Sequence, residues 1–130
     1  MADTVSAPRL DESTHEPAVT VAGRVRRRVR SLLARWGLAA EVVDDALMIV
    51  EELVANVLDH AGTRFRLVVE LSGSVLRIGV RDWCDRIPLV QPFDPGAARG
   101  RGLQLVAALA RQWGCQHHDR GKTVWAELAV

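Results

Sequence analysis

The amino-acid sequence predicts an α+β fold, a two-layer α/β sandwich in which helices cover one face of a mixed, mostly antiparallel sheet. Two stretches near the N-terminus repeat apolar residues at three- and four-residue steps, as amphipathic helices do. The period then falls to two in two runs rich in β-branched residues. A long loop, a third helical stretch and a second pair of strands follow. This order of elements is typical of helices that pack together against one sheet.

Length and composition indicate one globular domain. The chain has 130 residues, of which 48% are hydrophobic and 25% are charged, a balance that supports a packed core. The formal net charge of +1 argues against a global field that recruits nucleic acid or membrane. No apolar run reaches the roughly 18 residues of a membrane span, and the N-terminus lacks the pattern of a secretory signal. We therefore expect a cytoplasmic protein.

The helices are expected in the first half of the chain. Residues 1–16 are polar and predict a flexible tail, or at most a short edge strand, ahead of a single domain over residues 17–130. A first helix is expected over residues 18–36, with Gly37 as its stop. A second is expected from near Glu41 to Gly62, with acidic residues in its first turns, where the helix dipole favours them.

Two hairpins supply the strands. Residues 64–71 and 75–82 flank a Ser-Gly-Ser turn. Residues 83–102 contain three prolines and three glycines, and a loop of this length in a small domain is often a functional lid. A third helix is expected over residues 103–114. The last hairpin is expected over residues 115–130 and turns near Gly121.

Two polar residues of the second helix carry a chemical signal. Glu52 and Asn56 are four positions apart, so their side chains project from the same face, one turn apart. That face is not the apolar stripe that contains Leu53 and Val57. A carboxylate can accept a proton from an attacking hydroxyl group, and an amide oxygen is a hard ligand for Mg²⁺. The alternative is a polar face that is simply solvated.

Three further stretches suit a ligand. Residues 99–103 bring arginines and glycines to a helix start, where free N–H groups attract anions. Asp82 ends a strand and can accept a hydrogen bond from an exocyclic amine. Thr123 places a hydroxyl group at the start of the last strand. Each stretch has a plain structural alternative, which is a glycine-rich loop, a turn aspartate or a hairpin.

Taken in order, these stretches resemble the motifs of the GHKL ATPase superfamily, and more closely those of the small anti-sigma factor serine/threonine kinases and related actinobacterial regulatory ATPases. EELVANVLDHA at residues 51–61 resembles the N-box, and VRDWCDRIP at 80–88 stands where the adenine-binding box should be. GRGLQLVAALARQWG at 100–114 resembles the second glycine box, and GKTVWAEL at 121–128 resembles the closing Gly-Thr box. The resemblance spans residues 17–128 and implies the histidine-kinase-like (Bergerat) ATPase fold.

The resemblance also implies a role for each matching residue. Glu52 would be the catalytic base, and Asn56 would bind Mg²⁺ and tie it to the triphosphate of ATP. Asp82 would read the adenine amino group, and Thr123 would support that recognition, directly or through water. Four residues would contact the phosphates, namely Gly100, Arg101, Gly102 and Leu103.

One motif departs from the family pattern. The adenine box usually reads Asp-x-Gly-x-Gly, whereas Trp-Cys-Asp-Arg follows Asp82 in this chain. Glycine permits positive φ and the close approach of a ligand, which Trp and Cys do not provide. The departure weakens the expectation of nucleotide affinity more than that of the fold. Trp83, beside Asp82, could itself line a base pocket.

The resemblance implies an ATP- and Mg²⁺-dependent serine/threonine kinase that phosphorylates an anti-anti-sigma (STAS-type) protein and controls a sigma factor by partner switching, in the family usually as a homodimer. The missing glycines leave an alternative, a non-catalytic or weakly nucleotide-binding GHKL-fold module that sequesters a partner. The arginine-rich run over residues 24–30 is read as a solvated helix face. Docking of an acidic protein is the next interpretation, and nucleic-acid binding is the last.

Overall fold

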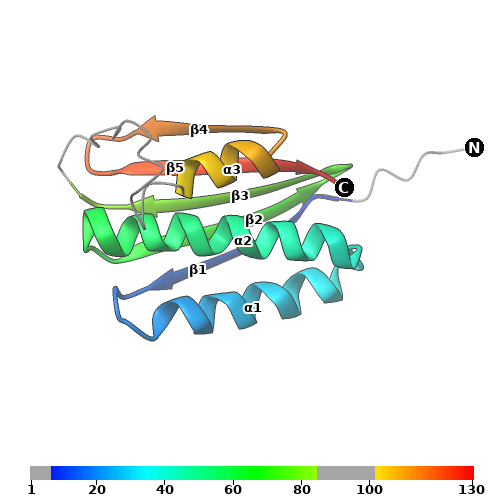
Figure 1. Cartoon of the computed structure of the whole chain (residues 1–130), viewed down its shortest axis with the longest axis horizontal. Helices are drawn as coiled ribbons and strands as arrows, with labels where there is room; N and C mark the ends of the chain where they lie inside the picture. Colours follow the sequence, from blue (N-terminus) through cyan, green and yellow to red (C-terminus); the bar gives the residue numbers. More distant parts are fainter. Residues whose placement is uncertain (1–6, 85–101) are drawn as a thin grey trace, which may run out of the picture.

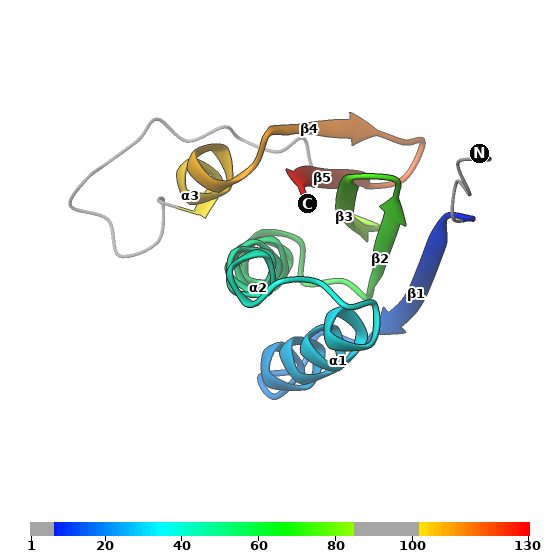
Figure 2. The ribbon, with the colours of Figure 1, turned by 90° about the vertical axis from the view of Figure 1, so that its right-hand side faces the viewer.

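The computed structural model describes residues 7–84 and 102–130. In these ranges the elements are β1 (Arg9–His15), α1 (Val21–Arg35), α2 (Ala40–Asn56), the π-helical turn η1 (Val57–Ala61), β2 (Phe65–Ser72), β3 (Val75–Asp82), α3 (Gly102–Leu109), β4 (Gln112–His117) and β5 (Lys122–Ala129). The strands form one sheet in the order β1-β2-β3-β5-β4, and each neighbouring pair is antiparallel. Figures 1 and 2 show the helices in one layer on the same side of the sheet. The predicted α+β sandwich is confirmed.

The core lies between the helix layer and the sheet. On β3, alternate residues turn toward the helices, and Leu76, Ile78 and Val80 are buried there. The helices contribute the apolar stripes that the sequence predicts, and α2 continues through η1 to Gly62, whose φ of +64° ends the helix. None of the helices in the described ranges has the length and apolar character needed to cross a bilayer.

Residues 9–15 form the edge strand β1 and not a flexible tail, so the alternative that the sequence left open for residues 1–16 holds for this part. This strand pairs with β2 along its whole length. The His15 ring stacks on Phe65 with 5.3 Å between the ring centroids, and Asp11 accepts hydrogen bonds from Arg28 at 3.1 Å. The polar composition concealed the strand because an edge strand gives few side chains to the core.

The third helix is shorter than predicted. α3 ends at Leu109, and the Arg111 N–H already donates to the Glu127 carbonyl oxygen at 2.7 Å, so the chain has joined the sheet. Gly114 lies in β4 and not at a helix end. The Trp125 ring packs over it, and a Cβ atom there would lie 2.8 Å from that ring. Trp113, also in β4, is 38% exposed.

The turn between β4 and β5 packs backbone to backbone against the end of β3. Gly121 has a φ of +81°, and a Cβ atom at this position would lie 2.0 Å from the carbonyl oxygen of Asp82. Only glycine can occupy such a position without moving the strand. This close approach fixes the start of β5 beside the end of β3, where the candidate site lies.

We expect Gly121→Ala to destabilise the fold much more than Gly73→Ala. Gly73 also has positive φ, +58°, but a Cβ atom there would meet nothing within 4 Å. In Gly73→Ala, the control, the free energy of unfolding should fall only by the cost of a left-handed backbone, about 1–2 kcal/mol. Gly121→Ala adds a steric overlap, so its free energy of unfolding should fall by about 3 kcal/mol or more. Urea unfolding followed by tryptophan fluorescence measures both losses. Equal losses would contradict the close packing at Gly121.

Candidate functional site

Four elements meet at one end of the sandwich. β3 ends there with Asp82 and β5 begins there with Lys122. The C-terminal end of α2 with η1, and the N-terminal end of α3, lie at the same end, on the left in Figure 1. The fold therefore gathers chemistry-bearing residues from segments that are far apart in the sequence.

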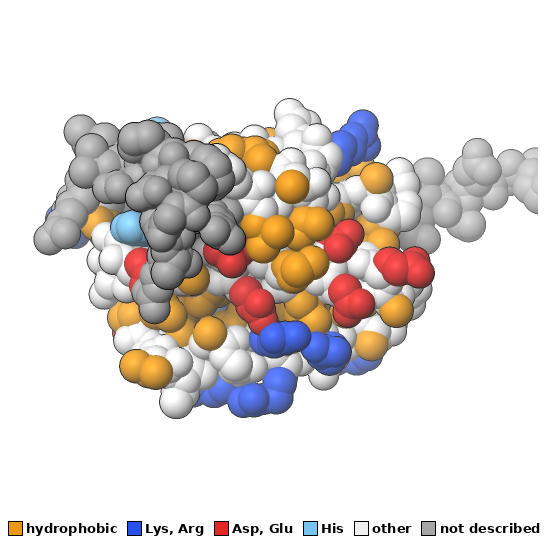
Figure 3. All heavy atoms as spheres, viewed as in Figure 1, with side chains coloured by type: hydrophobic (Ala, Val, Ile, Leu, Met, Phe, Trp, Pro, Cys, Tyr) orange, Lys and Arg blue, Asp and Glu red, His pale blue; other side chains and the backbone are white. Residues whose placement is uncertain are grey.

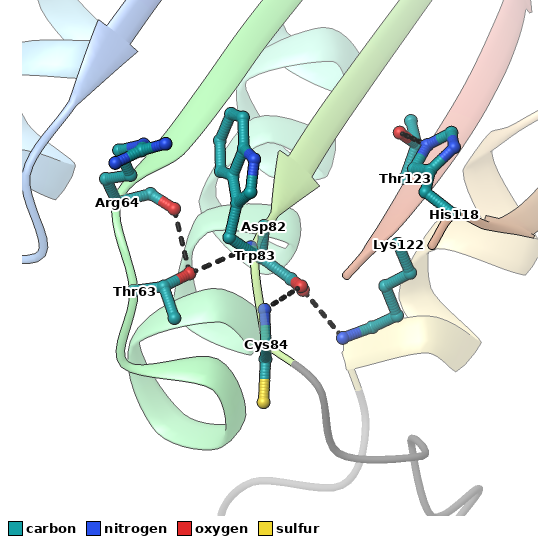
Figure 4. Close-up of polar contacts among 8 residues, drawn as sticks. All are labelled: Thr63, Arg64, Asp82, Trp83, Cys84, His118, Lys122 and Thr123. Carbon is teal, nitrogen blue, oxygen red and sulfur yellow. Dashed lines mark hydrogen bonds and ion pairs between the residues drawn. The ribbon is translucent and has the colours of Figure 1, made fainter. Parts of the chain in front are cut away.

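Asp82 and Lys122 form a buried ion pair at this end. Lys122 Nζ donates to Asp82 Oδ2 at 2.7 Å, and the Cys84 N–H donates to Asp82 Oδ1 at 3.0 Å (Figure 4). The side chains of Asp82 and Lys122 are only 2% and 8% exposed. They face each other because Arg81 pairs with Thr123, which places the next residues of β3 and β5 opposite one another. Both carboxylate oxygens of Asp82 thus have partners inside the chain.

The loop after η1 is fixed to the same place. Thr63 Oγ1 accepts a hydrogen bond from the Trp83 N–H at 3.1 Å and donates to the Arg64 carbonyl oxygen at 2.8 Å (Figure 4). Thr63 was not predicted as a site residue, because no local pattern marks it. Lys122 was not predicted either, although it is the only lysine in the sequence and directly follows the turn glycine.

Thr123 lies on the opposite face of the sheet from Asp82. Its Oγ1 is 2.7 Å from His118 Nε2, and its side chain lines a hollow on that face together with Arg77 and Trp125. The Thr123 hydroxyl therefore points away from Asp82. Successive side chains of a strand point to opposite faces, so the residue of this motif that faces Asp82 is Lys122.

Trp83 also turns away from the helix side of the sheet. Three guanidinium groups surround its ring, with Arg64 at 4.6 Å, Arg81 at 4.8 Å and Arg66 at 5.8 Å from the ring centroid. Arg66 and Arg81 pair across β2 and β3 on the face that carries Thr123. The interpretation of Trp83 as a wall of a pocket beside Asp82 is wrong, and the ring instead belongs to an arginine cluster.

Glu52 and Asn56 lie on the same face of α2 and are both half-buried. Directly after Asn56 the helix changes to the π-helical turn η1, a feature that is frequent at functional sites. Burial raises the pKa of Glu52, and the carboxylates of Glu51 and Asp59 raise it further. A carboxyl group with a raised pKa is suited to accepting a proton near neutral pH.

Glu51 has a different environment from its neighbour. Its carboxylate forms an exposed ion pair with Arg26 of α1 at 2.5 Å. Figure 3 shows a row of acidic side chains in the middle of this face of the molecule, with basic side chains gathered directly beneath. The arginine-rich run is the solvent-exposed face of α1, and two of its arginines, Arg26 and Arg28, bond to acidic residues of the same chain.

The remaining predicted site residues belong to the loop and the start of α3. Gly100 and Arg101 lie outside the described residues. Gly102 begins α3, and the half-buried Leu103 packs against the core. Across residues 7–84 and 102–130, no three His, Cys, Asp or Glu side chains gather closely enough to hold a metal ion by themselves.

Comparisons with known proteins agree with this fold. Residues 15–128 match a family described as the histidine kinase-like ATPase domain. Thirteen solved chains match. One of them contains the RsbU and RsbW domains of Rv1364c from Mycobacterium tuberculosis and superposes with a TM-score of 0.72 at 21% identity, over 95% of this chain and 32% of that chain. The match thus spans about a third of that longer chain, and at this identity it concerns the fold. No significant match was found among curated proteins.

Removing one member of the buried ion pair should be costly. We expect Asp82→Asn to lower the free energy of unfolding by about 3–5 kcal/mol, because the Lys122 ammonium is left buried without a counter-charge. The double variant Asp82→Asn with Lys122→Met should recover most of this loss. Urea denaturation of the two variants measures the difference. Equal losses in both would contradict a strong interaction between the two side chains.

The raised pKa of Glu52 predicts a pH-dependent effect on stability. A carboxyl whose pKa is higher in the folded than in the unfolded state loses its stabilising contribution as the pH rises through the folded pKa. We therefore expect Glu52→Gln to raise the free energy of unfolding at pH 7. The gain should disappear as the pH falls below 4.5, the ordinary value. Urea denaturation at pH 7 and at pH 4 measures it.

Glu51→Gln is the matched control for this experiment. It removes one carboxylate from the neighbouring position but also breaks the exposed ion pair with Arg26. It should therefore give no comparable gain at pH 7, and a loss of up to about 1 kcal/mol. Identical behaviour of the two variants would show that the environment of Glu52 is not distinctive.

Proposed function

The chain belongs to the histidine kinase-like ATPase family, and from this premise we propose that it is an ATP-dependent serine/threonine protein kinase that acts by partner switching. The observation that carries the proposal is the polar face of α2, where Glu52, with its raised pKa, lies one turn from Asn56. The proposed phosphoryl acceptor is a Ser or Thr hydroxyl group of an anti-anti-sigma, STAS-type protein. The proposed second partner is a sigma factor.

The residues of α2 fit the phosphate and metal end of such a site. The Asn56 side-chain oxygen would hold Mg²⁺ together with phosphate oxygens of the nucleotide. When bound, the metal would neutralise negative charge on the phosphates during transfer. The Glu52 carboxylate would orient the acceptor hydroxyl group and take its proton. Burial and the two neighbouring carboxylates favour the protonated form of Glu52, which makes it a better proton acceptor than an ordinary surface glutamate.

The end of β3 fits a nucleotide base less well. Asp82 is the proposed base-reading residue, but Lys122 and the Cys84 N–H already bond to its two oxygens. This observation favours the second candidate function. In that case the chain keeps the GHKL fold, binds nucleotide weakly or not at all, and regulates its partner by sequestering it.

The remaining parts of the proposal concern partners and location. We place the protein in the cytoplasm with its protein partners, as a homodimer. Direct contact with nucleic acid is not part of the proposal. Two arginines of the basic face of α1 already pair with Asp11 and Glu51, and the formal net charge is only +1. An electrostatic footprint for nucleic acid is generally larger.

Phosphoryl transfer from labelled ATP to a STAS-type protein tests the kinase proposal. We expect Glu52→Gln to slow the transfer by about 10²–10⁴-fold, because the acceptor proton loses its base. Asn56→Ala should raise the Mg²⁺ concentration needed for half-maximal rate. Glu51→Gln is the matched control and should keep the rate of the wild type.

The same assay separates the two candidate functions. Absence of saturable ATP binding and of transfer by the wild type would refute the kinase. Tight binding of the STAS-type protein or the sigma factor without nucleotide would then support sequestration. Transfer by Glu52→Gln at the wild-type rate would show that Glu52 is not the base.

A further inference from the structure

Lys122 is an unusual residue in this chain. It is the only lysine in the sequence, and its side chain is 8% exposed. Lysine is almost never fully buried without a partner, because an ammonium loses its hydration on burial. The partner here is Asp82, at 2.7 Å from Nζ. The single lysine of the chain is therefore paired with Asp82, the carboxylate that the proposed site would use to recognise a base.

The backbone holds this lysine in place. A Cβ atom on Gly121 would lie 2.0 Å from the Asp82 carbonyl oxygen and 2.8 Å from Trp83 Cα, so the two backbone segments touch directly. The register of β3 and β5 then sets Lys122 opposite Asp82 on the helix side of the sheet. The packing of the two backbone segments therefore fixes the Asp82–Lys122 ion pair in place, unlike an ion pair between mobile surface side chains.

The Lys122 ammonium offers the same kind of donor as the exocyclic amine of adenine. Each presents an N–H group that a carboxylate oxygen accepts at hydrogen-bond distance. Asp82 Oδ1 accepts from the Cys84 N–H, and the Lys122 ammonium holds Oδ2, so a base can bond to Oδ2 in the direction of Lys122 only by displacing the ammonium. A base that displaced the ammonium would leave it buried without its counter-charge, which opposes binding.

We propose that the Lys122 ammonium occupies the place at Asp82 where the amine of adenine would bind. By bonding to Asp82 in place of the base, Lys122 lowers the affinity of the site for adenine nucleotides. The inference rests on the proposed function in one respect, namely that Asp82 is the base-reading carboxylate. Nucleotide binding then requires the ion pair to open. Lys122 is thus a residue that sets nucleotide affinity, and not only a part of the scaffold.

Replacement of Lys122 tests the inference through the sign of the change in affinity. Removing a cation near a polyanionic ligand ordinarily weakens binding, and a purely structural lysine would give that result. If the ammonium occupies the base position, Lys122→Thr should bind Mg²⁺–ADP at least about tenfold more tightly than the wild type. Isothermal titration calorimetry with ADP measures the dissociation constants.

Two controls accompany this titration. Arg120→Thr removes an exposed cation from the same hairpin and should leave the affinity for ADP unchanged or weaker. GDP should gain nothing from Lys122→Thr, because guanine carries an acceptor oxygen where adenine carries its amine donor. A Lys122→Thr variant that binds ADP no more tightly than the wild type overturns the inference, as does an equal gain for GDP.

A measurement on the wild type does not depend on the folding of a variant. Because Lys122 is the only lysine, labelling with ¹⁵N-lysine gives one side-chain ammonium resonance in the NMR spectrum. ADP that reaches Asp82 must move this resonance, since the ammonium loses its partner. ADP binding that shifts the backbone amides of β3 and leaves the ammonium resonance unchanged overturns the inference. If Lys122→Thr does not fold, this measurement on the wild type decides between the two outcomes by itself.

The inference and the kinase proposal fail separately in these experiments. Equal and measurable ADP affinities of the wild type and Lys122→Thr overturn the inference and leave the kinase intact. A Lys122→Thr variant that binds ADP more tightly, beside a wild type that neither binds ATP saturably nor transfers a phosphoryl group to the STAS-type protein, supports the inference and refutes the kinase.

Discussion

The buried ion pair between Asp82 and Lys122 joins the two central strands at the end of the sandwich where the helices also converge. Because both charges are shielded from water, neither residue can change alone without leaving the other uncompensated. The constraint extends to the backbone, since Gly121 must remain a glycine for β5 to begin this close to Asp82. The hydrogen bond from Trp83 to Thr63 connects the same point to the end of η1.

The helix α2 serves the core and the candidate site with two adjacent faces. Leu53 and Val57 are buried against the sheet, while Glu52 and Asn56 stay half-buried beside them. The same burial that stabilises the apolar face removes water from Glu52, and nearby carboxylates add to the effect on its pKa. The chemical character of Glu52 therefore arises from the packing of the helix, whereas Glu51 forms an exposed ion pair with Arg26.

Membership of the histidine kinase-like ATPase family sets the fold and the general kind of site. The two candidate functions then differ in one physical question, which is whether a nucleotide base can compete with an internal ammonium for Asp82. The proposed metal and phosphate end of the site has suitable donors on α2, which favours the kinase. At the proposed base end, Lys122 and the Cys84 N–H already bond to Asp82, which favours sequestration.

The sequence by itself determined the helices, the hairpin of β2 and β3, the sandwich and the family, because periodicity and motifs are local along the chain. Only the tertiary structure decided what depends on distant partners. Residues 9–15 become a strand because β2 offers them an edge, and α3 ends early because the chain then joins β5. The side of the sheet to which the Thr123 side chain points also depends on a distant strand. A shift of one residue exchanges the two faces of a strand, so the register with β3 places Lys122, and not Thr123, against Asp82.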